Sequence, residues 1–172
     1  KTTNGGINWV DQDSVYSLCG IEFFDYNTGF AAGKYGGGKK TTNGRINWVQ
    51  MGSGCWHQWT TISCLSPDKW IVACEYICRT TNGGMNWNAI SGVNAAAIYF
   101  INNTTGFVGS DNGAIIKTTN AGDNWFALDT IISSLNPLNI MFVNENTGFI
   151  SAGSNQVYKT TDGGYNWSQQ VI

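Results

Sequence analysis

The chain has 172 residues, of which 42% are hydrophobic and only 12% charged, and its net charge is −2. Nine basic residues are scattered along the sequence, so no basic stripe can follow a phosphate backbone, and nucleic acid is not expected as a partner. The length suits one domain with a real core, and the absence of any run of about 18 apolar residues argues against a membrane span.

The sequence opens on KTTNGGINW, and this string returns four more times with small changes. We call the five copies boxes 1 to 5, and they occupy residues 1–9, 40–48, 79–87, 117–125 and 159–167. Their terminal tryptophans are separated by 39, 39, 38 and 42 residues. A period near 40 is typical of four-stranded propeller blades and of helical HEAT repeats. Because a catalytic motif is needed only once, five copies indicate architecture.

Between the boxes, each unit repeats the same order of short apolar runs. The first runs are IEFF at 21–24, ISCL at 62–65, IYFI at 98–101 and IMFV at 140–143. A turn, a second run and a third run follow, and a fourth run begins at the box tryptophan. Runs of four to six residues that are broken by Asn-Thr-Gly or Asn-Gly-Gly predict strands and hairpins. No segment is long enough between these breakers for an amphipathic helix.

We therefore expect an all-β fold, a β-propeller of four-stranded antiparallel blades that forms a single domain over residues 1–172. The expected blades span about 21–51, 62–91, 97–128 and 139–172, and residues 1–10 form the closing hairpin of a preceding blade. Four blades and a partial fifth indicate part of a larger ring, since propellers close on themselves. The alternative is a four-bladed ring whose first hairpin packs on its side or is lent to a neighbour.

The second unit departs from the others. The separation between Trp70 and Thr80 is one residue shorter than that between Phe30 and Thr41, which predicts a hairpin shortened by one residue. Lys69 also stands where the other units have the glycine of the Asn-Thr-Gly turn.

Within each box, the residue types predict a hydrogen-bonded corner. A short Asn or Asp side chain can accept bonds from the N–H groups of its own turn, and a threonine two positions earlier can complete the network. A glycine two positions later supplies a positive φ, and the tryptophan starts the outer strand and covers the hairpin. The predicted structural residues are Thr2, Asn4, Gly6, Trp9, Thr41, Asn43, Trp48, Thr80, Asn82, Gly84, Trp87, Thr118, Asn120, Gly122, Trp125, Thr160, Asp162, Gly164 and Trp167. Arg45 replaces the glycine in box 2, which predicts strain or another turn geometry there.

The pattern T-x-[ND]-x-G-x-x-W resembles the Asp-box, or bacterial neuraminidase repeat, of propeller blades. With the NTGF turn that recurs at a similar period, the whole chain resembles the repeats of the photosystem II stability and assembly factor family, which also occur in secreted bacterial proteins. The resemblance implies a non-catalytic propeller that presents a wide face to a protein partner. Asp-boxes also occur in sialidases and glucanases, so the resemblance leaves a fragment of a glycoside hydrolase as an alternative.

Enzyme activity is not expected from the residues themselves. A sialidase clamps its substrate with three arginines, and this chain has only Arg45 and Arg79. Other glycosidases need two facing carboxylates, whereas Asp25, Asp68 and Asp111 recur near turns and are interpreted as turn residues.

No metal or cofactor is expected either. One side-chain oxygen per box falls far short of the six to eight ligands of calcium. The only histidine is His57, and the sequence has no C-x-x-C pair for zinc.

A segment that interrupts the repeat is the main candidate for ligand binding. Residues 51–61 add Trp56, His57 and Trp59, and together with Tyr35 these rings could stack on a sugar. The alternative is that the tryptophans fill the space between blades. The predicted partner is therefore a protein or a glycan.

The five cysteines leave the pairing open. In a secreted protein, Cys74 and Cys78 could bridge across a hairpin, and Cys55 could pair with Cys19. The alternative is that these cysteines are buried free thiols. The low charge and the abundance of Thr, Asn and Trp favour a secreted or cell-surface bacterial protein.

Overall fold

The computed structural model describes residues 1–11, 18–33, 38–44, 46–52, 61–131, 137–153 and 155–171. Within these ranges the chain forms four antiparallel sheets of four strands each, and no helix. Blade 1 contains β1 (Leu18–Phe23), β2 (Gly29–Gly33), β3 (Gly38–Thr41) and β4 (Val49–Gln50). Blade 2 contains β5 (Thr61–Cys64), β6 (Trp70–Ala73), β7 (Ile77–Thr80) and β8 (Asn88–Ser91). Blade 3 contains β9 (Ala95–Phe100), β10 (Gly106–Ser110), β11 (Ala114–Thr118) and β12 (Phe126–Ile131). Blade 4 contains β13 (Pro137–Phe142), β14 (Gly148–Ala152), β15 (Gln156–Thr160) and β16 (Ser168–Gln170).

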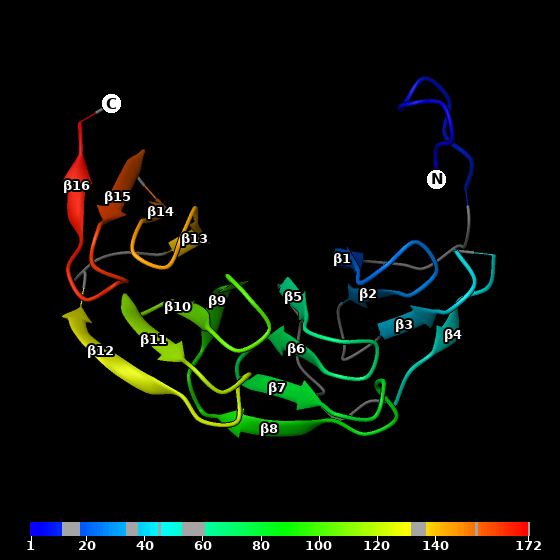
Figure 1. Ribbon diagram of the computed structural model, residues 1–172, viewed down its shortest axis with the longest axis horizontal. Coiled ribbons are helices and arrows are strands. Elements are labelled where there is room, and N and C mark those ends of the chain that lie inside the picture. The colour runs from blue at the N-terminus through cyan, green and yellow to red at the C-terminus, as the bar shows by residue number, and fades with distance from the viewer. Residues whose placement is uncertain are drawn as a thin grey trace.

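The blades fan around a common axis. In every blade, strands that are consecutive in sequence are also neighbours in the sheet. The strands β1, β5, β9 and β13 lie innermost and contact one another in turn, while β4, β8, β12 and β16 lie at the periphery (Figure 1). The expected propeller of four-stranded blades is therefore confirmed.

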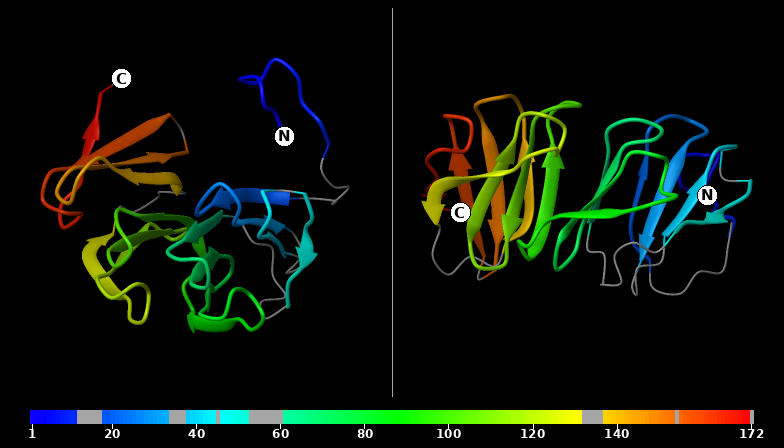
Figure 2. Two further views of the ribbon diagram at one scale, coloured as in Figure 1. Left: turned by 45° about the vertical axis from the view of Figure 1, so that its right-hand side comes forward. Right: turned by 90° about the horizontal axis from the view of Figure 1, so that it is seen from below.

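The four blades form an arc that is open on one side. The opening lies between blade 4 and the N-terminal residues 1–11, which form a loop beside blade 1 (Figure 1). Two further views also place blades 1 and 4 at opposite ends of the arc (Figure 2). Residues 1–11 contain no strand, although the backbone of Lys1 and Val10 exchanges two hydrogen bonds of 2.8 Å.

The second strand of each blade explains why the blades stack. Every residue of β2, β6 and β10 is buried, and each of these strands lies between two other strands of its own sheet. The outer strands are more exposed, and both residues of β4 face solvent. We call the side of a blade that faces the preceding blade its front face, and the opposite side its rear face.

An apolar cluster fills each space between adjacent blades. Between blades 1 and 2, the ring of Phe30 lies 5.4 Å from Trp70 and 5.5 Å from Trp87, centroid to centroid. Between blades 3 and 4, Phe107 stacks on Phe142 at 3.9 Å. Complete burial of a large apolar side chain contributes about 1.5–3 kcal/mol, so these contacts hold neighbouring blades together.

A glycine on the second strand receives an aromatic ring from the first strand in three blades. A Cβ atom on this glycine would lie only 2.3–2.7 Å from the nearest ring atom, so the ring requires glycine at this position. The cross-strand pairs are Phe23 with Gly29, Phe100 with Gly106, and Phe142 with Gly148.

Blade 2 exchanges the two partners between the strands. Cys64 on β5 lies opposite Trp70 on β6, so the small residue and the ring have changed places. Gly29 pairs with Thr41 and Trp70 pairs with Thr80, which places Trp70 at the position of the glycine. The sequence alignment of Trp70 with Phe30 is therefore wrong: the β6–β7 hairpin is shorter by two residues, and Lys69 does not replace the glycine.

The predicted bridge between Cys74 and Cys78 is wrong. Cys74 is a buried free thiol whose Sγ lies 3.8 Å from that of Cys78 and donates instead to the carbonyl of Tyr76 at 2.9 Å. Cys78 is disulfide-bonded, but not to Cys74. Burial raises the pKa of the Cys64 thiol to about 12 and also raises that of Cys74. Cys55 and the side chain of Cys19 lie outside the described part of the chain.

The ring-on-glycine contact predicts the outcome of a single methyl addition. In Gly106→Ala, the new Cβ would lie 2.6 Å from the ring of Phe100, which is itself held edge-on against Trp125. We expect a loss of about 1–3 kcal/mol in the free energy of unfolding, measured by urea titration. Gly92→Ala is the control, since nothing lies within 4 Å of its Cβ position. Equal effects of the two substitutions would contradict this packing.

Candidate functional site

The box corners are built around a threonine hydroxyl, most completely in box 5. The hydroxyl of Thr160 donates to Oδ1 of Asp162 at 2.8 Å and accepts the N–H of Gly164 at 3.0 Å. The same Oδ1 accepts the N–H of Asn166 at 2.9 Å. Thr160 is 1% exposed, so its buried hydroxyl and the Asp162 carboxylate together accept the N–H groups of Gly164 and Asn166.

The same bonds recur in the other boxes, with Asn in place of Asp. The glycine N–H donates to the threonine hydroxyl at 2.9 Å in boxes 1 and 3 and at 3.0 Å in box 4. In box 2, Thr41 donates to Asn43 at 3.1 Å, and Arg45 lies outside the described residues. The hydrogen bond from the Asn166 backbone lowers the pKa of Asp162 to about 2. Because neutral Asn serves equally well in four boxes, the corner needs the acceptor oxygen and not the charge.

In boxes 1, 3, 4 and 5, two successive residues have a positive φ, of which the sequence predicted only the second. In box 1, Gly5 and Gly6 have φ values of 69° and 94°, and in box 4, Ala121 and Gly122 have values of 59° and 77°. The first of the two donates its N–H to the turn between the first and second strands of the same blade. These bonds are Gly44 to Asn27 at 3.0 Å, Gly83 to Asp68 at 2.9 Å, Ala121 to Thr104 at 2.8 Å and Gly163 to Asn146 at 2.9 Å.

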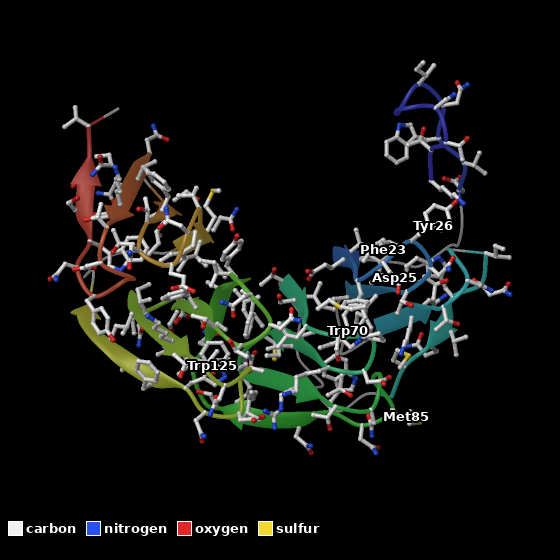
Figure 3. The ribbon with its side chains drawn as sticks, in the orientation of Figure 1. Phe23, Asp25, Tyr26, Trp70, Met85 and Trp125 are labelled. Carbon is white, nitrogen blue, oxygen red and sulfur yellow. The ribbon has the colours of Figure 1, made fainter. Side chains whose placement is uncertain are left out.

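The box tryptophans end the corners and lie one residue before the outer strands, not within them. The indole N–H of Trp167 donates to the carbonyl of Gly164 at 2.9 Å, and that of Trp9 to Gly6 at 3.0 Å. In blades 1, 3 and 4, the box tryptophan meets the inner-strand phenylalanine edge to face, at 6.1, 5.9 and 5.9 Å. The rings of Trp70 and Trp125 lie inside the stack of blades (Figure 3).

The basic residue that opens each of boxes 1 to 4 reaches the following blade, a role that sequence reasoning missed. Lys117 donates to the carbonyl of Gly163 in box 5 at 3.2 Å. Lys1 reaches the equivalent carbonyl of Gly44 in box 2 at 3.4 Å. The recurrence of Lys or Arg at the first position of all five boxes was the available signal.

Two of these ties use different acceptors. Lys40 donates to the carbonyl of Pro67 in blade 2 at 3.0 Å and lies 3.8 Å from Asp68. Arg79 pairs with the carboxylate of Asp123 in box 4. Lys40 thus links blade 1 to blade 2, and Arg79 links blade 2 to blade 3.

The carboxylates considered from the sequence serve turns. Oδ1 of Asp25 accepts the N–H groups of Asn27 and Thr28, both at 2.7 Å, and these bonds lower its pKa. Figure 3 shows Asp25 beside Tyr26 at the end of blade 1. Ser66, Asn102 and Asn144 accept the corresponding bonds in the other blades, at 2.9, 2.8 and 2.8 Å. Neutral residues therefore replace Asp25 at the equivalent sites, and Asp111 likewise accepts bonds from the side chains of Asn94 and Ser110 beside a turn.

Glu22, which the sequence did not indicate, is a largely buried carboxyl beside a cavity. Burial raises its pKa to about 7, while Oε2 accepts the N–H of Cys64 at 3.0 Å. It lines a cavity of about 280 Å³ among the inner strands of blades 1 to 3. No second acid is among the described residues that line this cavity. An acid and base pair for glycoside hydrolysis is therefore not assembled there.

The four residues predicted to bind a ligand are not among those that the structure describes. Tyr35, Trp56, His57 and Trp59 lie outside the described residues. Among the side chains that the structure does describe, no group of three or more potential metal ligands gathers. The same part of the chain has no helix long and apolar enough to cross a membrane.

The radial blades, the boxes and the ties between blades define the molecule as a β-propeller. No protein-family model and no curated protein matches the sequence. The structure is similar to an ancestral GH74 enzyme, with a TM-score of 0.73 and 21% identity over 88% of this chain and 23% of that chain. It is also similar to YCF48 from Cyanidioschyzon merolae, with a TM-score of 0.69 and 20% identity over 91% of this chain and 56% of that one.

A third solved structure has nearly the same length as this chain. The computationally designed Ika4 protein has a TM-score of 0.71 and 13% identity, over 92% of this chain and 99% of that one. The chain thus spans about a quarter of the GH74 enzyme and little more than half of the YCF48 chain. At these identities the likeness establishes the fold alone.

The corner geometry predicts a large effect from removing one hydroxyl. Thr160→Val keeps the side-chain shape but leaves the N–H of Gly164 without its acceptor in a buried corner. We expect a loss of about 1–3 kcal/mol in the free energy of unfolding. Thr161→Val is the matched control, because Thr161 adjoins Thr160 in the sequence but is exposed. If both variants unfold at the same urea concentration, the hydroxyl does not hold the corner.

Proposed function

We propose that the chain is a non-catalytic scaffolding propeller of a secreted or cell-surface bacterial protein, and that its boxes are Asp-boxes. It binds a protein partner along the rim formed by the box corners. The fold similarity to YCF48, which has also been solved bound to a D1 peptide, supports this class of function. Repeat proteins commonly use such extended, regularly spaced surfaces for binding.

One observation carries the proposal: the seventh residue of the box is a large, exposed apolar side chain in four of five boxes. These residues are Ile7, Ile46, Met85 and Tyr165, with exposures of 81%, 74%, 68% and 55%. We call this set the rim residues. Single exposed apolar residues need no explanation, but one per blade at the same corner makes a repeated apolar surface.

Box 4 departs from this pattern for a structural reason. Asp123 occupies the seventh position there and pairs with Arg79 of box 3. Lys69 also lies 3.7 Å from the same carboxylate. The acid is thus used in tying blade 2 to blade 3, and the rim surface is interrupted at this blade.

A second candidate function is a fragment of an Asp-box glycoside hydrolase or a lectin-like propeller. The similarity to GH74 enzymes and the raised pKa of Glu22 favour it. Against catalysis, the turn carboxylates have neutral counterparts in other blades, and the cavity at Glu22 offers no second acid among the described residues.

Assays of glycoside turnover and of protein cross-linking on the purified chain distinguish the scaffolding function from the enzyme and lectin alternatives. We expect no turnover of aryl glycosides or β-glucans between pH 4 and 8, and cross-linking in bacterial culture medium to a protein partner. The double variant Ile46→Glu/Met85→Glu should weaken that cross-linking at least tenfold. Val49→Glu is the control, since Val49 is 64% exposed on the outer strand β4 and is not one of the rim residues.

Two results would overturn the proposal. Turnover that Glu22→Gln abolishes would establish an enzyme. Binding on a glycan array that the rim double variant leaves unchanged, without any protein partner, would establish a lectin.

A further inference from the structure

The front face of blade 1 is an uncovered copy of a packing surface that is covered in the other blades. The first strand of each blade carries an isoleucine two residues before the position that pairs with the glycine or Trp70. Its exposure is 60% at Ile21, but only 8%, 7% and 1% at Ile62, Ile98 and Ile140. The same residue type is therefore buried wherever a preceding blade covers it.

The rear face of blade 4 shows the complementary feature. Phe30, Ile71 and Phe107 hold equivalent positions on the second strands and are all 0% exposed, whereas Phe149 is partly exposed. Met141, which pairs with Phe149 across the sheet, is 47% exposed. This face thus presents the residues that cover a following blade elsewhere in the chain.

The ties between blades also differ at the two ends of the arc from those in its interior. Lys159 opens box 5, and its Nζ lies 5.9 Å from the ring of Phe149 on the same blade. Lys117 at the equivalent position of blade 3 donates to the box of the next blade. At the other end, the carbonyl of Gly44 accepts a bond from Lys1 at 3.4 Å, which is longer than the 3.2 Å of the interior tie.

We propose that two copies of this chain associate head to tail and close a ring of eight blades. The rear face of blade 4 in each copy covers the front face of blade 1 in the other. The proposal extends the scaffolding function and rests on it, but it uses the end faces and not the rim residues.

The observations favour a second copy as the occupant. Four blades in each arc give a total within the four to eight blades common in propellers. A two-fold rotation makes the two contacts identical and leaves no open end, as closed symmetric assemblies require. The opening of the arc lies between the two faces that would meet (Figure 1).

The contacts inside the chain indicate which residues would meet across the copies. Tyr99 on the rear face of blade 3 packs against the cluster that contains Ile140 on the front face of blade 4. Met141 and Ile21 occupy the equivalent positions at the two ends of the arc. Lys39 takes the position of an apolar residue on the front face of blade 1, and the aliphatic stem of a lysine can cover apolar surface.

Residues 1–11 would yield their place on closure. They occupy the position of a preceding blade's outer corner, yet Trp9 and Val10 are 71% and 64% exposed there. The incoming blade 4 brings its own box 5, whose Lys159 can replace Lys1 at the carbonyl of Gly44. Association therefore competes with the N-terminal hairpin.

Sedimentation equilibrium of the purified chain tests the proposal. We expect a species of twice the 18.7 kDa chain mass that dissociates on dilution. Ile21→Glu and Met141→Glu should each weaken the association at least tenfold, because each places a charge in the apolar contact. Val49→Glu should leave it unchanged, since its counterparts Asn88 and Ser168 stay exposed in the other blades.

A charge pair tests the head-to-tail geometry directly. The double variant Ile21→Lys/Met141→Glu places opposite charges together at both contacts, so it should associate more tightly than either single variant. A wild-type chain that remains monomeric at about 100 µM, or a dimer that Ile21→Glu does not weaken, would overturn the proposal. The sedimentation assay contains only this chain, so it reports on self-association alone. A chain that forms the dimer but binds no protein partner through the rim residues would contradict the proposed function and leave the ring closure standing.

Discussion

The structure depends on a threonine hydroxyl buried at the corner of each complete blade. Such a corner reverses the chain within a few residues, and its backbone N–H groups would be left without partners if the hydroxyl and the Asx side chain did not accept them. The corner then docks on the turn between the first two strands through a single backbone bond. Both ends of the hairpins are thereby fixed, and the second strand can be apolar on both faces.

Packing and function use different parts of the same repeat. Buried strand residues such as Phe30 and Phe107 hold the blades together. The basic residues that open boxes 1 to 4 add polar bonds to the following blade, as Lys117 does. In boxes 1 to 3 the seventh residue, Ile7, Ile46 or Met85, is an exposed apolar side chain that can face a partner, whereas Tyr165 lies under Lys117 of the preceding blade. In box 4 the seventh residue is Asp123, whose carboxylate pairs with Arg79 of the preceding blade.

The blades could be predicted from the sequence because the signals that end their strands are local. The Asn-Thr-Gly turns and the Asx-Gly corners are each formed by residues only a few positions apart. Sequence reasoning misplaced Trp70, because the position of a ring on either of two paired strands depends on the opposite residue, here Cys64. It also missed the role of Lys117, whose acceptor lies 46 residues away in the next blade. Glu22 was missed for the same reason, since its pKa is raised by burial among other strands.

Native-state hydrogen exchange of the box glycines tests the central role of the hydroxyl most directly. The N–H groups of Gly84, Gly122 and Gly164 donate to buried threonine oxygens, whereas Gly6 makes the same bond in a hairpin without a sheet. The account predicts that the first three exchange at least about a hundredfold more slowly than Gly6, because their corners open only with the blade. Exchange of all four at one rate would contradict it.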